Sequence, residues 1–227
     1  ISLKINKGDF VAIVGNNGAG KSTLLKLISG VLSPDNGKIY TEGKINAIHE
    51  LTSGFNQELN GYENLELLAT LQRISKNEFL EKLNDVIFFS ELPHNALNKA
   101  IKYYSSGMKT RLAYAFNITF VKDILLLDEV LAVGDYNFIQ KCIAQLKLLT
   151  KKGITIVLVT HNIFQVENLI TKVYEIANHK MELIPLNAYK LKIKEEKDQI
   201  FFTDPNIKLH DITAKGENFK LKISEED

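Results

Sequence analysis

Cysteine, surplus charge of one sign and long hydrophobic runs are all scarce in this sequence. Cys142 is the only cysteine, so no internal disulfide can form, which fits a reducing compartment. Lysine and arginine total 28 against 27 acidic residues, and the resulting net charge of +1 gives no reason to expect nucleic acid or an acidic lipid surface. No stretch has the length and apolarity of a membrane span, and we expect no secretory leader. The protein is therefore expected to be soluble, or to reach a membrane through a partner.

A starting methionine is also missing. Residue 1 is isoleucine, and residues 1–5 already alternate like a strand, so we expect the natural chain to begin further upstream. The length of 227 residues fits one large domain, or one domain with a small appendage. Hydrophobic residues make up 45% and charged residues 24%, which is ordinary for a globular protein with a real core.

The apolar pattern predicts an α/β domain that contains a helical insertion. Fully apolar strands, of the kind found in a parallel sheet covered on both faces, are predicted at 10–14, 124–127 and 154–159. Shorter strands are expected at 1–5, 38–40, 44–49, 172–177 and 181–184. Helical spacing marks 24–28, 61–71, 76–89, a segment from 107 onward and 138–149. We expect the middle helices to form a subdomain inserted in the sheet.

A glycine-rich loop joins the first apolar strand to the helix that follows it. Glycines let its backbone N–H groups converge on one anion, and the positive end of the helix dipole points at the same spot. Lys21 adds a positive charge for the β- and γ-phosphates, and Ser22 offers a hydroxyl to Mg²⁺. A plain turn with a chance lysine is the alternative, but strand, loop and helix supply the context that this motif requires. The predicted nucleotide-binding residues are Gly15, Asn16, Asn17, Gly18, Ala19, Gly20, Lys21, Ser22 and Thr23.

Acidic residues and a histidine follow two of the apolar strands. A carboxylate at the C-terminal end of a parallel strand faces the ligand crevice, so Asp128 is predicted to hold Mg²⁺, directly or through water. Glu129 is predicted to orient or deprotonate the water that attacks the γ-phosphate. His161 is predicted to hydrogen-bond the γ-phosphate and that water. Two solvated acids and a structural histidine are the alternatives, and the upstream phosphate loop disfavours both.

A second helix start has the composition of an anion site. Tyr104-Ser105-Ser106-Gly107 precedes the helix, with small residues, a serine hydroxyl and free N–H groups. A plain helix N-cap would explain it in isolation. Because the chain already has one phosphate loop, a second anion site makes sense if it serves the nucleotide of another subunit.

Taken in order, these motifs resemble those of the ATP-binding subunit of ABC transporters, over residues 1 to about 185. The resemblance implies an α/β P-loop NTPase fold with a parallel-sheet core, an antiparallel β edge and an inserted helical subdomain. Residues 15–23 match the Walker A loop, 124–129 match Walker B with its catalytic glutamate, and His161 matches the switch histidine. Residues 104–108 stand at the place of the family signature. The resemblance further implies that 132–135 form the D-loop, which adds Asp135 to the nucleotide site, and that Glu50 occupies the Q-loop glutamine position. Glutamate at that position and Ser106 in place of a signature glycine are departures from the family pattern.

Variants of these motifs resemble one branch of the family, which exports O-antigen, capsule or teichoic acid across bacterial inner membranes. The variants are Tyr104–Met108, 128–135 and 50–64. The resemblance implies a homodimer that binds two ATP molecules with Mg²⁺, each between residues 15–23 of one subunit and Ser105–Gly107 of the other. It also implies an integral-membrane permease that docks near 50–64 and holds the ATPase at the cytoplasmic face of the membrane, with no nucleic acid bound.

The end of the chain leaves alternatives open. We expect the ATP-binding domain at 1–185, followed at 186–227 by a solvated tail or the start of a small β appendage. Residues 219–227 echo residues 1–9, which favours a soluble tandem ATPase acting on ribosomes or nucleic acid, whereas the near-neutral charge and the signature variant disfavour it. A third reading takes the tail as the start of a carbohydrate-binding module.

Overall fold

A computed structural model of the chain describes residues 1–48, 54–128, 135–178 and 180–203. It divides into two compact units, Ile1–Leu183 and Ile184–Asp227. No helix in the described ranges is long and apolar enough to cross a bilayer.

The first unit is built on a six-stranded sheet with the strand order β2-β3-β4-β1-β5-β6. β1 (Phe10–Gly15) pairs in parallel with β4 (Thr155–Val159) and β5 (Lys172–Ala177), and β3 (Ile124–Asp128) pairs in parallel with β4 and with β2 (Ile45–Ile48). β6 (Lys180–Ile184) forms the edge next to β5. The parallel pairing of strands β1 to β5 confirms the predicted α/β fold.

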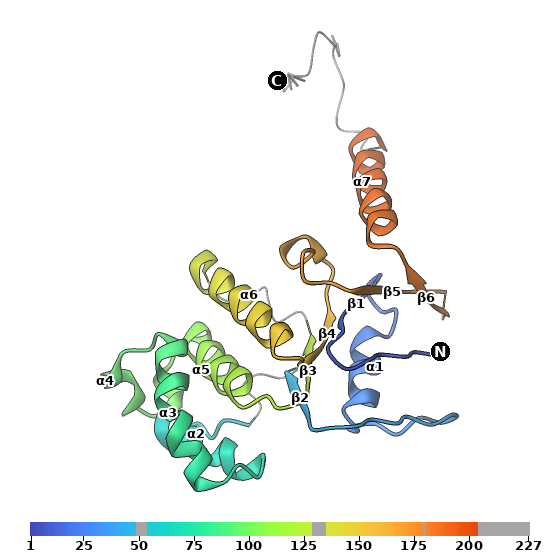
Figure 1. Ribbon diagram of the computed structural model, residues 1–227. Coiled ribbons are helices and arrows are strands. Elements are labelled where there is room, and N and C mark those ends of the chain that lie inside the picture. The colour runs from blue at the N-terminus through green and yellow to red at the C-terminus, as the bar shows by residue number, and fades with distance from the viewer. Residues whose placement is uncertain (49–53, 129–134, 179, 204–227) are drawn as a thin grey trace, which may run out of the picture. The chain divides into compact units, whose positions relative to one another are not determined.

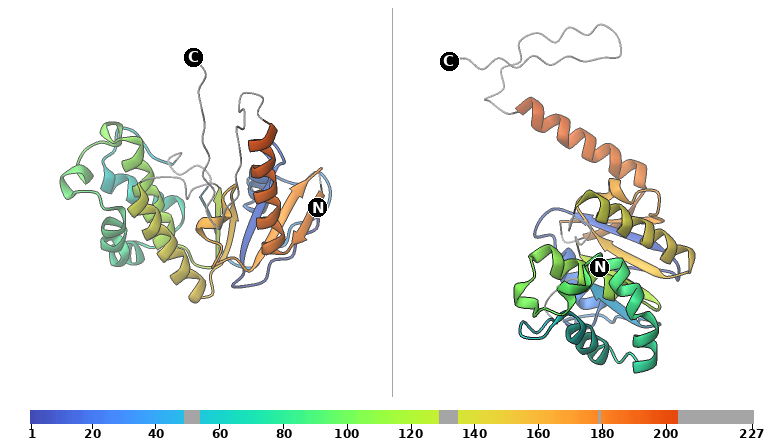
Figure 2. Two further views of the ribbon diagram at one scale, coloured as in Figure 1. Left: turned by 90° about the horizontal axis from the view of Figure 1, so that it is seen from above. Right: turned by 90° about the vertical axis from the view of Figure 1, so that its left-hand side faces the viewer.

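Helices cover both faces of the sheet, which explains why its central strands are apolar throughout. Alternate side chains of a strand face opposite ways, so Leu125 and Leu127 lie in one core cluster and Leu126 lies in another. The first cluster includes residues of α5 (Ser106–Thr119) and α6 (Tyr136–Lys151), and the second is closed by α1 (Lys21–Ile28) through Leu25. Figures 1 and 2 show α1 and α6 on opposite faces of the sheet.

The helical insertion gathers at the β2 edge of the sheet (Figure 1). It consists of α2 (Gly61–Leu71), α3 (Lys76–Ser90), the short α4 (His94–Leu97), the 3-10 turn η1 (Ile101–Tyr103) and α5. Helices α2 and α3 begin at polar caps: Asn60 forms a reciprocal capping box with Glu63, and Ser75 accepts a hydrogen bond from the N–H of Glu78. Helix α6 and a second 3-10 turn, η3 (Ile163–Gln165), complete the described helices of this unit.

Two predicted strands do not form. Residues 1–5 and 38–40 lie outside regular structure. The alternation at the start of the chain is real, because Leu3 and Ile5 pack against the second core cluster, but a strand also requires a partner backbone. The described residues provide no ladder for either segment. Tyr40 in the second segment is 84% exposed.

The second unit contains α7 (Leu186–Thr203), where the sequence predicted a tail or the start of a β appendage. This segment lacks proline and glycine and is rich in Leu, Ala, Lys, Glu and Gln, all of which favour helix. The echo at 219–227 lies outside the described residues.

Close packing at Gly61 gives a first prediction. A Cβ built on this residue would lie 2.5 Å from Tyr104 Oη and 3.1 Å from Leu97 Cα, and the backbone atom cannot easily retreat. Gly61→Ala is therefore expected to destabilise the protein by about 1–3 kcal/mol and to lower Tm by roughly 3–10 °C. Gly107→Ala is the matched control, since its Cβ would meet nothing closer than Ser105 Oγ at 3.9 Å. Equal Tm values for the two variants in thermal melts would contradict the packing argument.

Candidate functional site

The phosphate loop begins at Gly15, the last residue of β1. Any other residue at this position would force the neighbouring backbone to move. Gly15 has φ +146, and a Cβ there would lie 2.4 Å from the carbonyl oxygen of Ile176 on the neighbouring strand β5. Gly18 and Gly20 also have positive φ, at +78 and +94, but nothing lies within 4 Å of their Cβ positions. The loop is thus shaped by backbone conformation, and its glycines leave room for a ligand.

Lys21 lies inside this loop. Its side chain is 7% exposed, and Nζ donates to the carbonyl oxygens of Gly15 at 2.9 Å and Asn16 at 3.0 Å. Helix α1 starts here without a side-chain cap and without an acidic residue in its first turn. Among the described residues, no group accepts from the N–H groups of Lys21, Ser22 or Thr23. An ammonium group and uncapped helix N–H groups at one place fit a phosphate anion.

The sheet brings the other predicted residues to the same edge as the phosphate loop. Asp128 of β3 pairs with Val159 of β4, which in turn pairs with Ile13 of β1, close to the end of each strand. The N–H of Thr160 donates to the carbonyl oxygen of Ile13 at 3.2 Å, and the exposed His161 follows directly. Parallel strands that end together place Asp128, His161 and the start of the phosphate loop at one edge of the sheet. Glu129 and Glu50 lie outside the described residues.

Few protein side chains at this edge of the sheet could bind Mg²⁺. Among the described residues, no group of three or more His, Cys, Asp or Glu side chains could hold a metal ion. The side chain of Ser22 is exposed and that of Asp128 is partly buried. A hydroxyl and a carboxylate fit Mg²⁺, which is usually held by one or two protein groups together with nucleotide phosphates and water.

The second helix start is a capped one. The side chain of Ser105 accepts a hydrogen bond from the N–H of Met108 at 3.2 Å, and α5 begins at Ser106. Ser106 is exposed. In the described part of one chain, no hydrogen bond joins Ser105–Gly107 to the phosphate loop. Within one chain, Ser105–Gly107 therefore form a capped helix start that is separate from the phosphate loop.

Comparison with known families identifies the family of the chain. The family model described as ABC transporter matches residues 1–132, which include the phosphate loop, Asp128 and Ser105–Gly107. The chain belongs to the ABC transporter family. As an ABC ATPase it binds and hydrolyses ATP.

Curated relatives of this ABC subunit carry the names of polymer exporters. The chain is 42% identical over 184 residues to the O-antigen export system ATP-binding protein RfbB of Klebsiella pneumoniae, covering 81% of this chain and 74% of that protein. It is 36% identical over 211 residues to the teichoic acids export ATP-binding protein TagH of Staphylococcus epidermidis, covering 88% and 79%. Both matches extend well beyond the motifs themselves.

Solved structures support the same ABC fold. The dimeric ATP-binding cassette MJ0796, in a post-hydrolysis state bound to ADP and Pi, matches with a TM-score of 0.68 and 25% identity, covering 81% of this chain and 88% of that chain. An ATP binding subunit of an ABC transporter matches with a TM-score of 0.73 and 23% identity, covering 87% and 89%.

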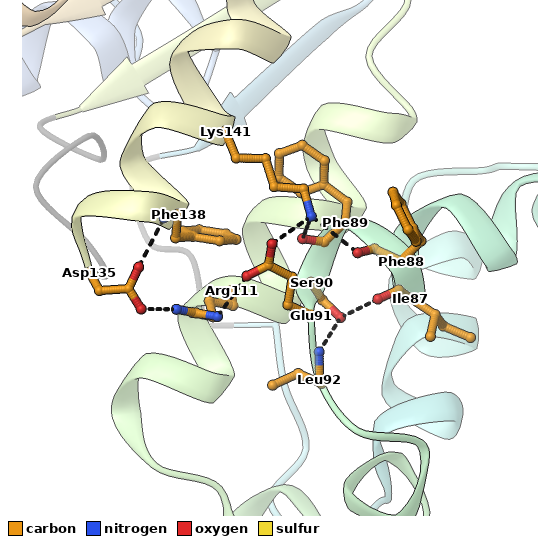
Figure 3. Close-up of polar contacts among 10 residues, drawn as sticks. All are labelled: Ile87, Phe88, Phe89, Ser90, Glu91, Leu92, Arg111, Asp135, Phe138 and Lys141. Carbon is orange, nitrogen blue, oxygen red and sulfur yellow. Dashed lines mark hydrogen bonds and ion pairs between the residues drawn. The ribbon is translucent and has the colours of Figure 1, made fainter.

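Asp135 of this ABC subunit is placed by local structure. It is the N-cap of α6, and its Oδ1 accepts from the N–H of Phe138 at 2.9 Å. Its Oδ2 accepts from Arg111 of α5, a residue that the sequence analysis did not single out (Figure 3). Arg111 lies five residues after the start of α5, but nothing in the local pattern identified its partner.

Asn64 is a second residue that the sequence analysis missed. It is fully buried in the first turn of α2. Its Oδ1 accepts from the N–H of Asn56 at 2.7 Å, and its Nδ2 donates to the carbonyl oxygens of Asn56, Leu59 and Asn60 at 2.9 to 3.0 Å. One side chain thereby holds the loop that precedes α2.

The carboxyl group of Asp135 gives a prediction on pH dependence. The hydrogen bond from the N–H of Phe138 lowers the pKa of Asp135 below its ordinary value of 3.8. Burial opposes this effect, and the nearby Arg111 lowers the pKa further. A lowered folded pKa stabilises the protein above pH 3.8, and this contribution is lost as the pH falls through the folded value. Asparagine caps helices as well as aspartate does. Asp135→Asn should therefore be less stable than the wild type at pH 7, and the two proteins should be equally stable at a pH below the folded pKa of Asp135. Urea unfolding midpoints across this range test it, and a constant difference at all pH values would contradict it.

Proposed function

We propose that this ATPase drives the export of a polysaccharide or teichoic acid across a bacterial inner membrane. The phosphate loop with its inward-pointing Lys21 carries the ATP-dependent part of the proposal. The names of the RfbB and TagH relatives support the substrate class. No sugar-binding residue enters the argument.

The working unit is a head-to-tail homodimer. Each ATP lies between Gly15–Thr23 of one subunit and Ser105–Gly107 of the other, with Mg²⁺ held by Ser22 and Asp128. Glu129 activates the attacking water and His161 contacts the γ-phosphate, while Asp135 and Glu50 complete the nucleotide site. The γ-phosphate favours the closed dimer because it contacts both subunits, and its hydrolysis removes that differential contact. The dimeric state of the MJ0796 cassette supports this arrangement.

A separately encoded membrane permease converts closure of the dimer into transport. It docks near residues 50–64 and on the helical insertion, and it holds the ATPase at the cytoplasmic face. The ordered loop that Asn64 supports, just after the segment 50–53, is suited to such docking.

Co-expression with a candidate membrane permease tests the proposal. The two proteins should co-purify from detergent-solubilised membranes, and the pair should place polymer on the cell surface in an ATPase-dependent manner. A chain that hydrolyses ATP but neither co-purifies with the permease nor affects surface polymer would overturn the export assignment while leaving the ATPase intact.

A further inference from the structure

One carboxylate bridges two helices outside the predicted nucleotide site. Glu91 follows the last residue of α3, and its Oε2 accepts from Arg111 Nη1 of α5 at 3.2 Å. Its other oxygen, Oε1, accepts from Lys141 Nζ of α6 at 2.9 Å. Figure 3 shows the two cations approaching Glu91 from different helices. The carboxylate therefore joins the end of α3 to α5 and α6 together.

Glu91 adopts a backbone conformation that glycine would adopt more easily. It is the C-cap of α3 with φ 56 and ψ 22, in the left-handed region. L-residues are disfavoured there, and glycine is the usual residue at such helix ends. The glutamate side chain must therefore provide something that glycine could not.

Both cations bind further groups, so the bridge is not an isolated surface pair. Lys141 Nζ also donates to the carbonyl oxygens of Phe88 at 3.2 Å and Phe89 at 3.1 Å, which closes the C-terminal end of α3. Arg111 pairs with Asp135 through Nη2, and its guanidinium lies 4.7 Å from the ring centroid of Phe138. The side chains of Arg111, Lys141 and Glu91 are 19%, 26% and 45% exposed, so solvent screens the bridge less than it screens a fully exposed pair.

We infer that Glu91 is a positioning residue for ATP hydrolysis, which holds the starts of α5 and α6 in register. The start of α5 carries Ser105–Gly107, and α6 begins immediately after Asp135. Both segments belong to the proposed dimeric nucleotide site, so this inference rests on the proposed function. Glu91 itself contacts neither the phosphate loop nor any residue assigned to the nucleotide. Its loss should therefore misalign the second phosphate-binding segment without weakening the first.

Two substitutions separate positioning from simple stabilisation. Glu91→Gly removes the carboxylate and relieves the left-handed backbone, so Tm should stay near the wild-type value. Glu91→Gln keeps the shape of the side chain and removes its charge. Glu81→Gln is the control, because Glu81 is exposed on the same helix and forms no ion pair within the described residues.

We expect both Glu91 variants to lose about tenfold in kcat, with an affinity of the full chain for ATP close to those of the wild type and of Glu81→Gln. The Tm should stay close to the wild-type value in Glu91→Gly and should fall in Glu91→Gln, which loses both ion pairs without relieving the backbone. Hydrogen–deuterium exchange should increase in peptides covering 105–112 and 135–141 but not in those covering 15–23. A kcat within twofold of wild type in both variants, or a loss that follows Tm or ATP affinity, would overturn the inference. A wild-type chain without ATPase activity would count against the proposed function instead, and the exchange data would then decide the role of Glu91: unchanged exchange at 105–112 and 135–141 would overturn it.

Discussion

Replacement of Glu129 by glutamine is expected to lower kcat for ATP hydrolysis by about 10²–10⁴-fold and to leave ATP binding intact. Glu129 directly follows Asp128, the last residue of β3. Asp128 pairs with Val159 of β4 and lies at the edge of the sheet where the phosphate loop begins. Glutamine keeps the size of the side chain and one acceptor oxygen but cannot accept a proton from the attacking water. Only the chemical step should suffer.

Single-turnover and steady-state phosphate release, together with ATP titration, measure the two effects separately. Because bound ATP is no longer hydrolysed, the variant should also accumulate as a dimer in size-exclusion chromatography with ATP and Mg²⁺. Glu81→Gln is again the matched control for removal of one negative charge. Wild-type turnover in Glu129→Gln would remove this residue from the mechanism.

Replacement of Lys21 by alanine is expected to weaken ATP binding by about 10²–10³-fold, since removing one partner of a buried charged contact costs about 3–5 kcal/mol. Nζ of Lys21 lies within 3.0 Å of two loop carbonyl oxygens, so its charge is already in place before the ligand arrives. In the variant, the triphosphate would meet the helix N–H groups alone.

Isothermal titration calorimetry with ATP and Mg²⁺ measures this loss. Lys26→Ala, in the last turn of the same helix, is the matched control and should bind ATP like the wild type. Thermal protection by ATP should disappear in Lys21→Ala, while its Tm without nucleotide should change little. Unaltered affinity in this variant would contradict the phosphate role of the loop.

Local chemistry explains which parts of the site were predictable. The phosphate loop combines glycines, a lysine and a hydroxyl within nine positions, between a strand and a helix that both have strong apolar patterns. The predicted helix at 61–71 coincides with α2, and the predicted helix at 76–89 differs from α3 by one residue at its end. In each case the residues that specify the motif or helix are close together in the sequence.

Contacts between distant segments were not predictable in this way. Glu91 and Lys141 are separated by 50 positions, and Arg111 and Asp135 by 24, so no periodicity links them. The missing strands at 1–5 and 38–40 have the same cause, because a strand depends on a partner backbone that the segment itself does not specify. The alternation of side chains predicted which face of residues 1–5 is buried, but it could not predict a partner strand.

The hydrogen bonds of the Asn64 side chain bear on the proposed docking of a permease at the loop that precedes α2. These hydrogen bonds fix the loop backbone before any contact is made, and ordering each free residue would otherwise cost roughly 1–2 kcal/mol. A rigid loop attached to the first turn of α2 would pass the movement of a bound partner on to the whole helix, whereas a flexible loop would take up that movement itself.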